Sequence, residues 1–368
     1  MKDNNYYMER AIKLALKAKG KTSPNPLVGA LVVKDGRIVG EGYHQQAGLP
    51  HAEIIALDEA GRRAEGATLF VTLEPCVHFG RTPPCVNRII KSKIKKVVIG
   101  MRDPNPLNNG KGIEILRKNK ISVECGFRED VLREINEVFI KYITQKIPYV
   151  TVKVAQSLDG KIATSTGDSK WVTSDASRNY AHRLRQYFDA VMVGVNTILR
   201  DDPLLSCRLP GFAKKQPLRI IVDSHLSTPQ NAKIFQSEGK VIIATLKSPR
   251  GQEPANRQIL SQKATILEVR EVNGQVNLYD LMKKLAKMEI TNILVEGGGT
   301  LIGSLFDEAL VDKVMFFISP KIIGGREAIS SVEGKGIRQL IKAPVLKDMV
   351  FKKIDNDILI EGRIEYHR

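Results

Sequence analysis

The sequence is poor in cysteine and in aromatic residues. Its 368 residues include four cysteines and one tryptophan, and aromatic residues make up 6% of the chain. Four cysteines in a chain of this length do not form the dense disulfide framework of small secreted proteins. Few aromatics disfavour a nucleic-acid surface, in which aromatic and basic side chains alternate. We therefore expect a cytoplasmic protein, in a reducing compartment, that does not bind nucleic acid.

The N-terminal segment lacks a long apolar run. Residues 1–20 carry charge throughout, so we expect neither a signal peptide nor a membrane span, and no membrane partner. Apolar residues recur in this segment at helical spacing, which predicts an amphipathic helix that packs on a core. These residues are Met8, Ala11, Ile12, Ala15 and Leu16.

Positive charges outnumber negative charges, and the formal net charge is +17. Lysines are spread along the whole chain and are not gathered in one arm or one recognition helix. We interpret them as solvated helix faces that also attract small anions, in preference to a nucleic-acid interface. A phosphorylated substrate and a phosphorylated cofactor fit this charge.

The length and the 42% of hydrophobic residues predict two domains, each with its own core. We place the boundary so that the domains are 1–146 and 147–368. In the first domain, strands and helices alternate as far as a helix at residues 129–143. This alternation predicts helices packed over a mostly parallel sheet, and the fold class is α/β.

The second domain begins with a buried strand near residue 149 and is also predicted to be α/β. Ser174 is the expected N-cap of a helix that ends near residue 186. Residues 349–366 are expected to form a closing hairpin. Further buried strands are predicted at 189–195, 218–224, 240–246, 264–269 and 292–298.

A histidine and a glutamate two positions apart, His51 and Glu53, precede two cysteines, Cys76 and Cys85. One neutral imidazole and two thiolates suit a tetrahedral Zn²⁺ ion and leave its fourth position open for water, whose pKa the metal lowers. A carboxylate that does not bind the metal, here Glu53, can carry a proton from that water to the substrate. This residue set is typical of a zinc deaminase.

The elements expected before the cysteines place the first half of this motif. An apolar hairpin with its turn at Asp35-Gly36 is followed by a helix at residues 51–63. His51 and Glu53 therefore lie in the first turn of that helix. A buried strand is expected next, at residues 67–73.

The two cysteines are expected at the ends of neighbouring elements. Cys76 comes just after the strand, and Pro83-Pro84-Cys85 opens another helix, since proline is tolerated in a first helical turn. Two helix N-termini and one strand end then meet at one point. Their partial positive charge favours the thiolate form of both cysteines.

A glycine run marks the second domain. A buried strand runs into Gly297, Gly298 and Gly299, and an apolar helix follows. Glycines in such a turn let backbone N–H groups approach a pyrophosphate at a helix N-terminus. A tight turn without a ligand is an equally good interpretation. The spacing differs from the G-x-G-x-x-G of a Rossmann unit, which disfavours that fold.

Longer motifs resemble a known family. Eight residues, 77–84, separate the two cysteines, which departs from the P-C-x-x-C of cytidine and tRNA deaminases. The insert VHFGRTPP and the upstream SPNPLVGALVV resemble the pyrimidine deaminase of riboflavin biosynthesis. VKVAQSLDGKIAT, WVTS, NTILRDDPLLSCR and VEGGGTLIGSL resemble the reductase of the same pathway. The chain is therefore similar, over nearly its whole length, to the bifunctional riboflavin-biosynthesis deaminase/reductase family.

The resemblance implies a fold and two reactions. The N-terminal domain is expected to have the three layers of cytidine deaminases, and the C-terminal α/β domain to be similar to dihydrofolate reductase. The first implied reaction is the zinc-dependent hydrolysis of the 2-amino group of 2,5-diamino-6-(5-phosphoribosylamino)pyrimidin-4-one. The second is an NADPH-dependent reduction of the ribosyl group to ribityl, giving 5-amino-6-(5-phosphoribitylamino)uracil. A homo-oligomer, either a dimer or a tetramer, is expected.

The resemblance also assigns roles by position in the matching motifs. Glu53 is the implied catalytic residue, and Lys153 and Asp201 are candidates for the proton donor of the reductase. The implied substrate residues of the deaminase are Asn25, His44, His78 and Arg81. Those of the reductase are Lys153, Ser169, Arg185, Leu205, Arg208 and Glu296. The implied NADPH residues are Ala155, Trp171, Thr197, Asp201, Ser224, Gly298, Gly299, Thr300, Leu301, Ile302, Gly303 and Ser304.

Three other classes of protein remain open at this stage. One is a deaminase of RNA or DNA bases whose second domain binds the nucleic acid. Another is a deaminase with a degenerate, regulatory second domain. The third is a zinc-stabilised scaffold without activity, which would close the metal site with a fourth protein ligand such as His78.

Overall fold

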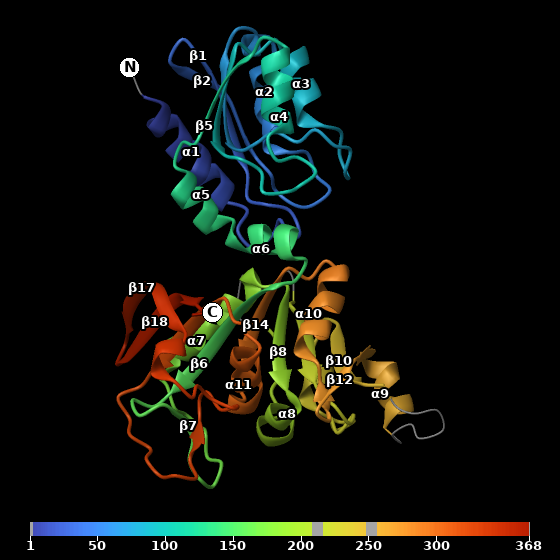
Figure 1. Cartoon of the computed structure of the whole chain (residues 1–368), viewed down its shortest axis with the longest axis vertical. Coiled ribbons are helices and arrows are strands. Elements are labelled where there is room, and N and C mark those ends of the chain that lie inside the picture. The colour runs from blue at the N-terminus through green and yellow to red at the C-terminus, as the bar shows by residue number, and fades with distance from the viewer. Residues whose placement is uncertain (1–2, 208–215, 248–255, 368) are drawn as a thin grey trace. The chain divides into compact units, whose positions relative to one another are not determined.

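The computed structural model describes residues 3–207, 216–247 and 256–367. The chain divides into two compact units, Met1–Ile147 and Pro148–Arg368 (Figure 1). The boundary predicted from the sequence, between residues 146 and 147, lies one residue before this division. Within the described ranges, no helix has both the length and the apolar character needed to cross a bilayer.

The first unit contains a five-stranded sheet in the order β2-β1-β3-β4-β5. The strands are β1 (Gly29–Lys34), β2 (Arg37–Tyr43), β3 (Thr68–Leu73), β4 (Lys96–Met101) and β5 (Ser122–Cys125). Only β3, β4 and β5 are parallel, whereas β1 is antiparallel to both β2 and β3. The prediction of a mostly parallel sheet was therefore wrong for strands β1 and β2 of this sheet. The hairpin that turns at Asp35-Gly36 adds an antiparallel edge.

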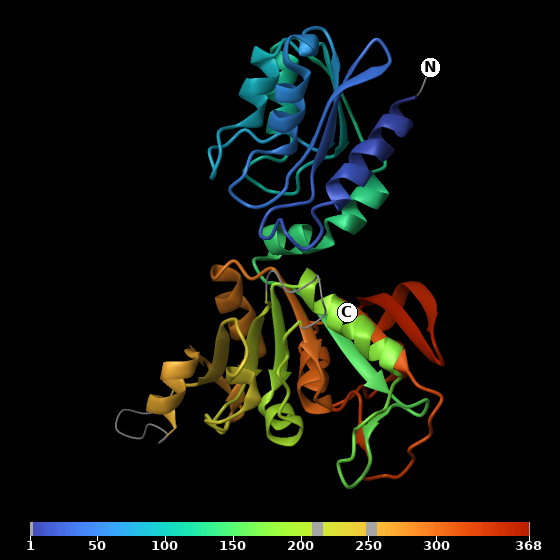
Figure 2. The same ribbon diagram turned by 180° about the vertical axis from the view of Figure 1, so that it is seen from behind.

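Helices cover both faces of this sheet, so the unit has three layers. Figure 2 shows α1 and α5 on one face and α2 with α3 on the other. The helices are α1 (Asn4–Leu16), α2 (Ala52–Ala60), α3 (Cys85–Lys91), α4 (Lys111–Lys118), α5 (Glu129–Ile135) and α6 (Glu137–Gln145). Gly42 lets α2 approach β2 closely, because a Cβ there would lie 2.5 Å from the Ala52 carbonyl oxygen. This close approach fixes the start of α2.

The helix predicted at residues 129–143 is two helices in the structure. The chain bends at Asn136, where φ is −109° and ψ is 15°. The buried side chain of Asn136 accepts a hydrogen bond from the Leu27 N–H at 2.8 Å and donates one to the Leu27 carbonyl at 3.2 Å. The helix is interrupted where Asn136 forms these bonds to a distant loop. The helical spacing of apolar residues gives no sign of such bonds.

The second unit contains a nine-stranded sheet in the order β11-β10-β9-β8-β14-β6-β15-β18-β17. Its strands from β11 to β15 are parallel to their neighbours, and β18 and β17 add an antiparallel edge. The strands are β6 (Tyr149–Gln156), β8 (Ala190–Gly194), β9 (Leu218–Val222), β10 (Val241–Leu246), β11 (Thr265–Val269), β14 (Asn292–Glu296), β15 (Lys313–Ile318), β17 (Val345–Ile354) and β18 (Asp357–Glu365).

The helices and small ladders of the second unit surround this sheet (Figure 1). Ser174 caps the first helix as predicted, since its hydroxyl accepts a hydrogen bond from the Ser177 N–H. The helices are α7 (Asp175–Leu184), α8 (Val195–Asp201), α9 (Arg257–Lys263), α10 (Leu278–Lys287) and α11 (Gly299–Asp307). The ladders pair β7 (Lys161–Ala163) with β16 (Ile329–Ser330) and β12 (Glu271–Val272) with β13 (Gln275–Val276).

Candidate functional site

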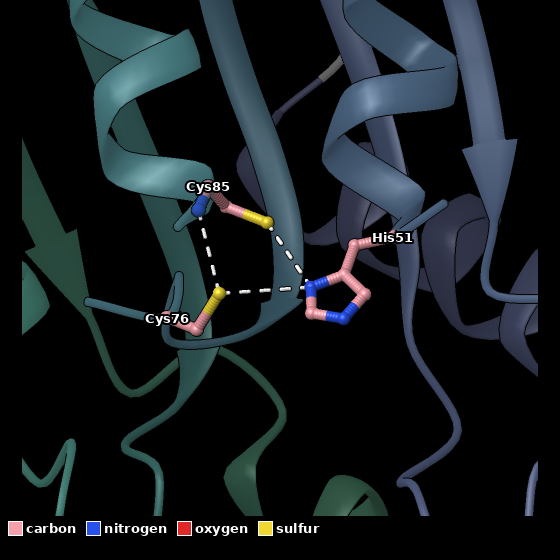
Figure 3. Close-up of side chains that lie close together, drawn as sticks. All are labelled: His51, Cys76 and Cys85. Carbon is pink, nitrogen blue, oxygen red and sulfur yellow. Dashed lines mark hydrogen bonds between the residues drawn. The ribbon is translucent and has the colours of Figure 1, made fainter. Parts of the chain in front are cut away.

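The three predicted metal ligands meet at one point of the first unit. His51 is the N-cap of α2, Cys85 is the first residue of α3, and Cys76 follows the end of β3. Their ligand atoms all lie within 4.8 Å of one another. The Nδ1 atom of His51 is 3.1 Å from the Cys85 sulfur and 3.6 Å from the Cys76 sulfur (Figure 3). The predicted convergence of two helix starts and a strand end is present.

This donor set fits zinc. One imidazole nitrogen and two sulfurs are typical ligands of a tetrahedral Zn²⁺ site with an open fourth position. The Nδ1 atom of His51 faces both sulfurs, and its Nε2 atom is 3.1 Å from the Thr82 hydroxyl. A hydrogen bond at the second ring nitrogen fixes the orientation of a metal-binding histidine. Nδ1 is therefore the nitrogen that is available to a metal.

The two sulfurs differ in their affinity for a proton. A hydrogen bond from the Cys85 thiol, together with His51, outweighs burial and lowers the pKa of Cys76 to about 4. The same hydrogen bond and burial raise the pKa of Cys85 well above its ordinary value. Cys76 is therefore the sulfur favoured as a thiolate, and metal binding has to displace the proton of Cys85. The hydrogen bond with Cys76 also raises the pKa of His51, whose Nδ1 atom has to be free of a proton to bind a metal.

Glu53 lies beside this cluster without joining it. Its side chain is buried, with 4% exposure, and it contacts the Cys85 thiol. Burial raises the pKa of Glu53, although His51 opposes the shift. A carboxyl group with a raised pKa is suited to accept a proton and release it again near neutral pH.

Two of the predicted substrate residues lie together next to the cluster. The Nδ2 atom of Asn25 is 3.0 Å from the Nε2 atom of His44. The ring of His44 meets that of His51 edge to face at 5.4 Å between centroids. Burial lowers the pKa of His44, and a hydrogen bond between its Nδ1 atom and the Pro50 carbonyl opposes this only in part. His44 is therefore favoured in its neutral form.

The other two predicted substrate residues lie on the loop between the cysteines. His78 is not part of the three-residue cluster, which is the one group of potential metal ligands found among the described residues. The Nδ1 atom of His78 is buried and has no hydrogen-bond partner among the described residues. Arg81 is exposed. A fourth protein ligand from His78, as expected for an inactive scaffold, is thus not supported by the geometry.

A buried polar network behind Cys76 was not predicted from the sequence. Glu74 accepts hydrogen bonds from the N–H groups of Asp103, Gly110 and Gly112 at 3.1, 2.9 and 2.9 Å. Asn108 joins Asp103 to the chain around Cys76. Burial raises the pKa of Asp103 to about 6. The polar run DPNPLNNGKG at residues 103–112 was the available signal.

In the second unit, predicted cofactor residues gather at the carboxyl ends of four neighbouring parallel strands. These strands are β9, β8, β14 and β6 in sheet order. Ligands of open α/β sheets bind beyond this edge. Ser224 follows β9, Thr197 and Asp201 belong to α8 after β8, Gly298 follows β14, and Ala155 lies near the end of β6.

The glycine run has two different roles in the structure. Gly297 and Gly298 have φ of 80° and 79° and turn the chain from β14 into α11, beside the Thr197 hydroxyl. Gly299 and Gly303 instead let residues 330–334 pack on α11. A Cβ at Gly303 would lie 2.2 Å from the Glu333 carbonyl oxygen. Of these glycines, only Gly297 and Gly298 therefore form the turn itself.

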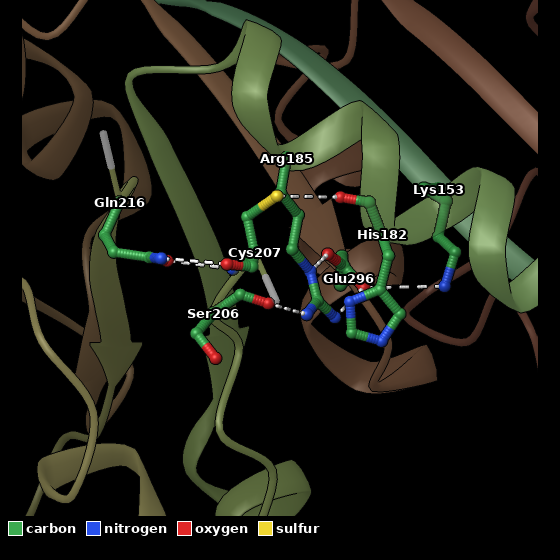
Figure 4. A network of polar contacts seen from close by, with 7 residues as sticks. All are labelled: Lys153, His182, Arg185, Ser206, Cys207, Gln216 and Glu296. Carbon is green, nitrogen blue, oxygen red and sulfur yellow. Dashed lines mark hydrogen bonds and ion pairs between the residues drawn. The ribbon is translucent and has the colours of Figure 1, made fainter. Parts of the chain in front are cut away.

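A buried charged cluster adjoins the same edge (Figure 4). Arg185 binds Glu296 through two nitrogens at 2.6 and 3.0 Å, and Lys153 is 3.5 Å from the same carboxylate. Arg185 also donates to the Ser206 carbonyl at 2.8 Å. Burial alone would raise the pKa of Glu296, but Arg185 and Lys153 outweigh it and hold the pKa at about 2. Three predicted substrate residues are thus in contact.

The remaining predicted residues of the reductase are not part of this charged cluster. Ser169 donates a hydrogen bond to Asp201 at 3.3 Å, and Leu205 is buried. Trp171 is 62% exposed, so it is not an ordinary core residue, and the Arg178 guanidinium stacks on its ring at 4.2 Å. Arg208 lies outside the described residues.

Comparisons with known proteins identify both units. The cytidine and deoxycytidylate deaminase zinc-binding region matches residues 1–101, and the RibD C-terminal domain matches residues 148–360. The riboflavin biosynthesis protein RibD of Aquifex aeolicus is 47% identical, and the match covers 97% of each chain. The chain belongs to the RibD family. It is therefore an enzyme of riboflavin biosynthesis that combines a zinc-dependent deaminase with an NADPH-dependent reductase.

Solved structures of RibD proteins have the same fold. The Acinetobacter baumannii RibD structure has a TM-score of 0.86 at 35% identity, and 98% of each chain is covered. A deaminase/reductase from Thermotoga maritima has a TM-score of 0.84 at 38% identity, again with 98% of each chain covered. The predicted α/β fold class and family are thereby confirmed. RibD membership also removes the nucleic-acid deaminase and the inactive scaffold from consideration.

Proposed function

We propose that residues 1–146 deaminate the 2-amino group of 2,5-diamino-6-(5-phosphoribosylamino)pyrimidin-4-one, and that residues 147–368 then reduce its ribosyl group to ribityl. The observation that carries the first assignment is the convergence of His51, Cys76 and Cys85 beside the buried Glu53. The second assignment is supported by the charged cluster and the glycine turn at one edge of the nine-stranded sheet.

Glu53 moves the protons of the deamination. Zinc, when bound by His51, Cys76 and Cys85, lowers the pKa of a water molecule in its fourth position. Glu53 takes a proton from that water and passes it to the ring nitrogen next to the attacked carbon. A second proton transfer releases the amine as ammonia, so that one water is consumed for each ammonia formed. The raised pKa of Glu53 suits a group that is protonated and deprotonated in turn.

Asn25, His44, His78 and Arg81 hold the substrate in this proposal. The amide nitrogen of Asn25 bonds to His44, which leaves its oxygen for an N–H of the pyrimidine. A neutral His44 avoids placing a second cation beside the metal. The exposed guanidinium of Arg81 suits the ribose phosphate, because it can donate two parallel hydrogen bonds to phosphate oxygens.

The reductase residues position NADPH against the opened sugar. NADPH, when bound, supplies the hydride that reaches C1′. The chain has to orient both molecules and supply a proton to the ring oxygen. Lys153 is one candidate donor, because Glu296 holds its ammonium group at 3.5 Å on the sheet edge. Asp201 is the other candidate. It accepts a hydrogen bond from Ser169, so a predicted NADPH residue contacts a predicted substrate residue.

Two substitutions test the deaminase assignment. Glu53→Gln keeps the metal but removes the proton carrier, so ammonia release should fall by at least about 10²-fold at unchanged zinc content. Cys76→Ser should lose zinc. Cys125→Ser changes an exposed free cysteine and serves as the control. Deamination by Glu53→Gln at the wild-type rate, or stoichiometric zinc in Cys76→Ser, would contradict the assignment.

We further propose that the protein is a homo-oligomer that associates through β17. This edge strand has ten residues, and Val350 and Phe351 are 59% and 63% exposed. Exposed apolar side chains on an edge strand can pair with another chain, and here they lie between Lys347 and Lys352. Sedimentation should show a smaller particle for Phe351→Lys than for the wild type, and an unchanged mass would oppose this interface.

Location in the cytoplasm is also proposed, since the ligand thiols need a reducing compartment.

A further inference from the structure

The turn that carries Cys76 is fixed by hydrogen bonds from a side chain that does not contact the metal ligands. Cys76 follows β3, and its sulfur accepts a hydrogen bond from the Cys85 N–H at 3.3 Å. The loop that continues from Cys76 to α3 contains no helix or strand. The position of the sulfur therefore depends on what fixes the backbone on either side of Cys76.

Asn108 contacts the backbone on both sides of Cys76. Its Oδ1 atom accepts a hydrogen bond from the Val77 N–H at 3.0 Å. Its Nδ2 atom lies 3.4 Å from both the Glu74 and the Pro75 carbonyl oxygens. The side chain of Asn108 has no exposed surface, so water does not compete for these bonds.

Asp103 determines which way the Asn108 amide points. The Asp103 Oδ2 atom accepts a hydrogen bond from Asn108 Nδ2 at 3.0 Å, and its Oδ1 atom accepts one from the Asn105 N–H at 2.9 Å. A carboxylate only accepts, so the amide must present its NH₂ group to Asp103 and its oxygen to Val77. Hydrogen bonds to a carboxylate are about twice as strong as neutral ones.

We propose that Asn108, oriented by Asp103, is a positioning residue of the metal centre that sets the place of the Cys76 sulfur. This inference rests on the proposed role of Cys76 as a ligand. Partners that orient a ligand without binding the metal typically change metal affinity 10- to 100-fold when removed, by rough order of magnitude. Asn108 acts in this way through the backbone of residues 74–77.

The direction of the Asp103–Asn108 bond offers a test by exchange of the two residues. Asp103→Asn alone turns an NH₂ group toward a donor, either Asn108 Nδ2 or the Asn105 N–H, because the amide keeps only one acceptor oxygen. Asn108→Asp alone places two carboxylates about 3 Å apart, as the present contact implies. In the double variant, Asn at 103 donates to Asp at 108, which still accepts from Val77. The two 3.4 Å contacts of Nδ2 with carbonyl oxygens become contacts between two acceptors, so the recovery is expected to be partial.

The probe is Co²⁺, bound to the full-length, metal-depleted protein at pH 8, where Asp103 is ionised. Affinity is measured against a chelator, and the thiolate-to-cobalt absorption reports the geometry of the sulfurs. Each single variant should bind Co²⁺ at least about tenfold more weakly and shift this absorption. The double variant should bind Co²⁺ more tightly than either single variant. Asn119→Asp, on an exposed helix end, is the matched control and should match the wild type.

Two results would overturn the proposal. One is wild-type affinity and absorption in both single variants, even if their unfolding midpoints fall, because that pattern describes a purely structural pair. The other is a double variant as weak as the single ones. Cys76→Ser separates this failure from failure of the metal site: if it loses the cobalt–thiolate absorption while Asn108→Asp does not, Cys76 is a ligand and only the positioning role is wrong.

Discussion

Glu296 is a buried carboxylate that two cations hold in its charged form. Its pKa in the folded protein is about 2, and the ordinary value is 4.5. A depressed pKa adds stability above pH 4.5, and this stability is lost as the pH falls through 4.5 toward 2. The difference corresponds to about 3 kcal/mol. Acid should therefore destabilise the second unit through this one residue more than through an exposed carboxylate.

Glu296→Gln tests this charge. At pH 7 the variant should unfold more easily by about 3–5 kcal/mol, because it leaves Arg185 and Lys153 buried without a counter-charge. Between pH 5 and pH 2.5 its free energy of unfolding should fall less than that of the wild type. Urea unfolding at several pH values measures both effects. Glu361→Gln, which removes a more exposed partner of Lys313, should keep the acid dependence of the wild type. Equal acid dependence in Glu296→Gln would refute the shift.

The sequence predicted a cluster that could hold a metal, because zinc demands particular ligand types at places that local structure determines. His51 and Glu53 in a first helical turn, and Cys76 after a strand, required only local patterns. Asn108 was not predicted, because an asparagine in a polar loop is usually a turn residue. Its role depends on a contact with Val77, 31 residues away, which no local pattern contains.

At the scale of elements, the glycines of α11 lead to a prediction about packing. Gly303→Ala would place a Cβ 2.2 Å from the Glu333 carbonyl oxygen, and the backbone of residues 333–334 cannot rotate away as a side chain can. We expect a loss of about 1–3 kcal/mol in the free energy of unfolding. Gly194→Ala, where the nearest atom is 3.6 Å away, should cost less than about 1 kcal/mol. Equal unfolding midpoints for the two variants would contradict this packing role.

Elements with strong periodicity were predicted well, and those fixed by distant contacts were not. The hairpin of β1 and β2, the start of α2 and the hairpin of β17 and β18 agree with the sequence interpretation. The break between α5 and α6 was missed, because Asn136 bonds to Leu27 across 109 residues. The antiparallel pairing of β1 with β3 was also missed, since alternation of strands and helices does not determine strand order.

At the scale of the whole molecule, the chain joins two units that use different chemistry on one substrate. The proposed deaminase residues lie in the first unit and the proposed reductase residues in the second, so we expect that each activity can be lost separately. Glu53→Gln should lower ammonia release from the diaminopyrimidine by at least about 10²-fold. It should still oxidise NADPH when given the deaminated substrate.

The most direct measurement supplies the zinc-loaded protein with 2,5-diamino-6-(5-phosphoribosylamino)pyrimidin-4-one, with and without NADPH. Ammonia release and NADPH oxidation are followed together. We expect ammonia in both samples, NADPH consumption in one, and the ribityl product only where NADPH is present. Ammonia without NADPH consumption would contradict the reductase assignment, and the absence of both signals would contradict the account as a whole.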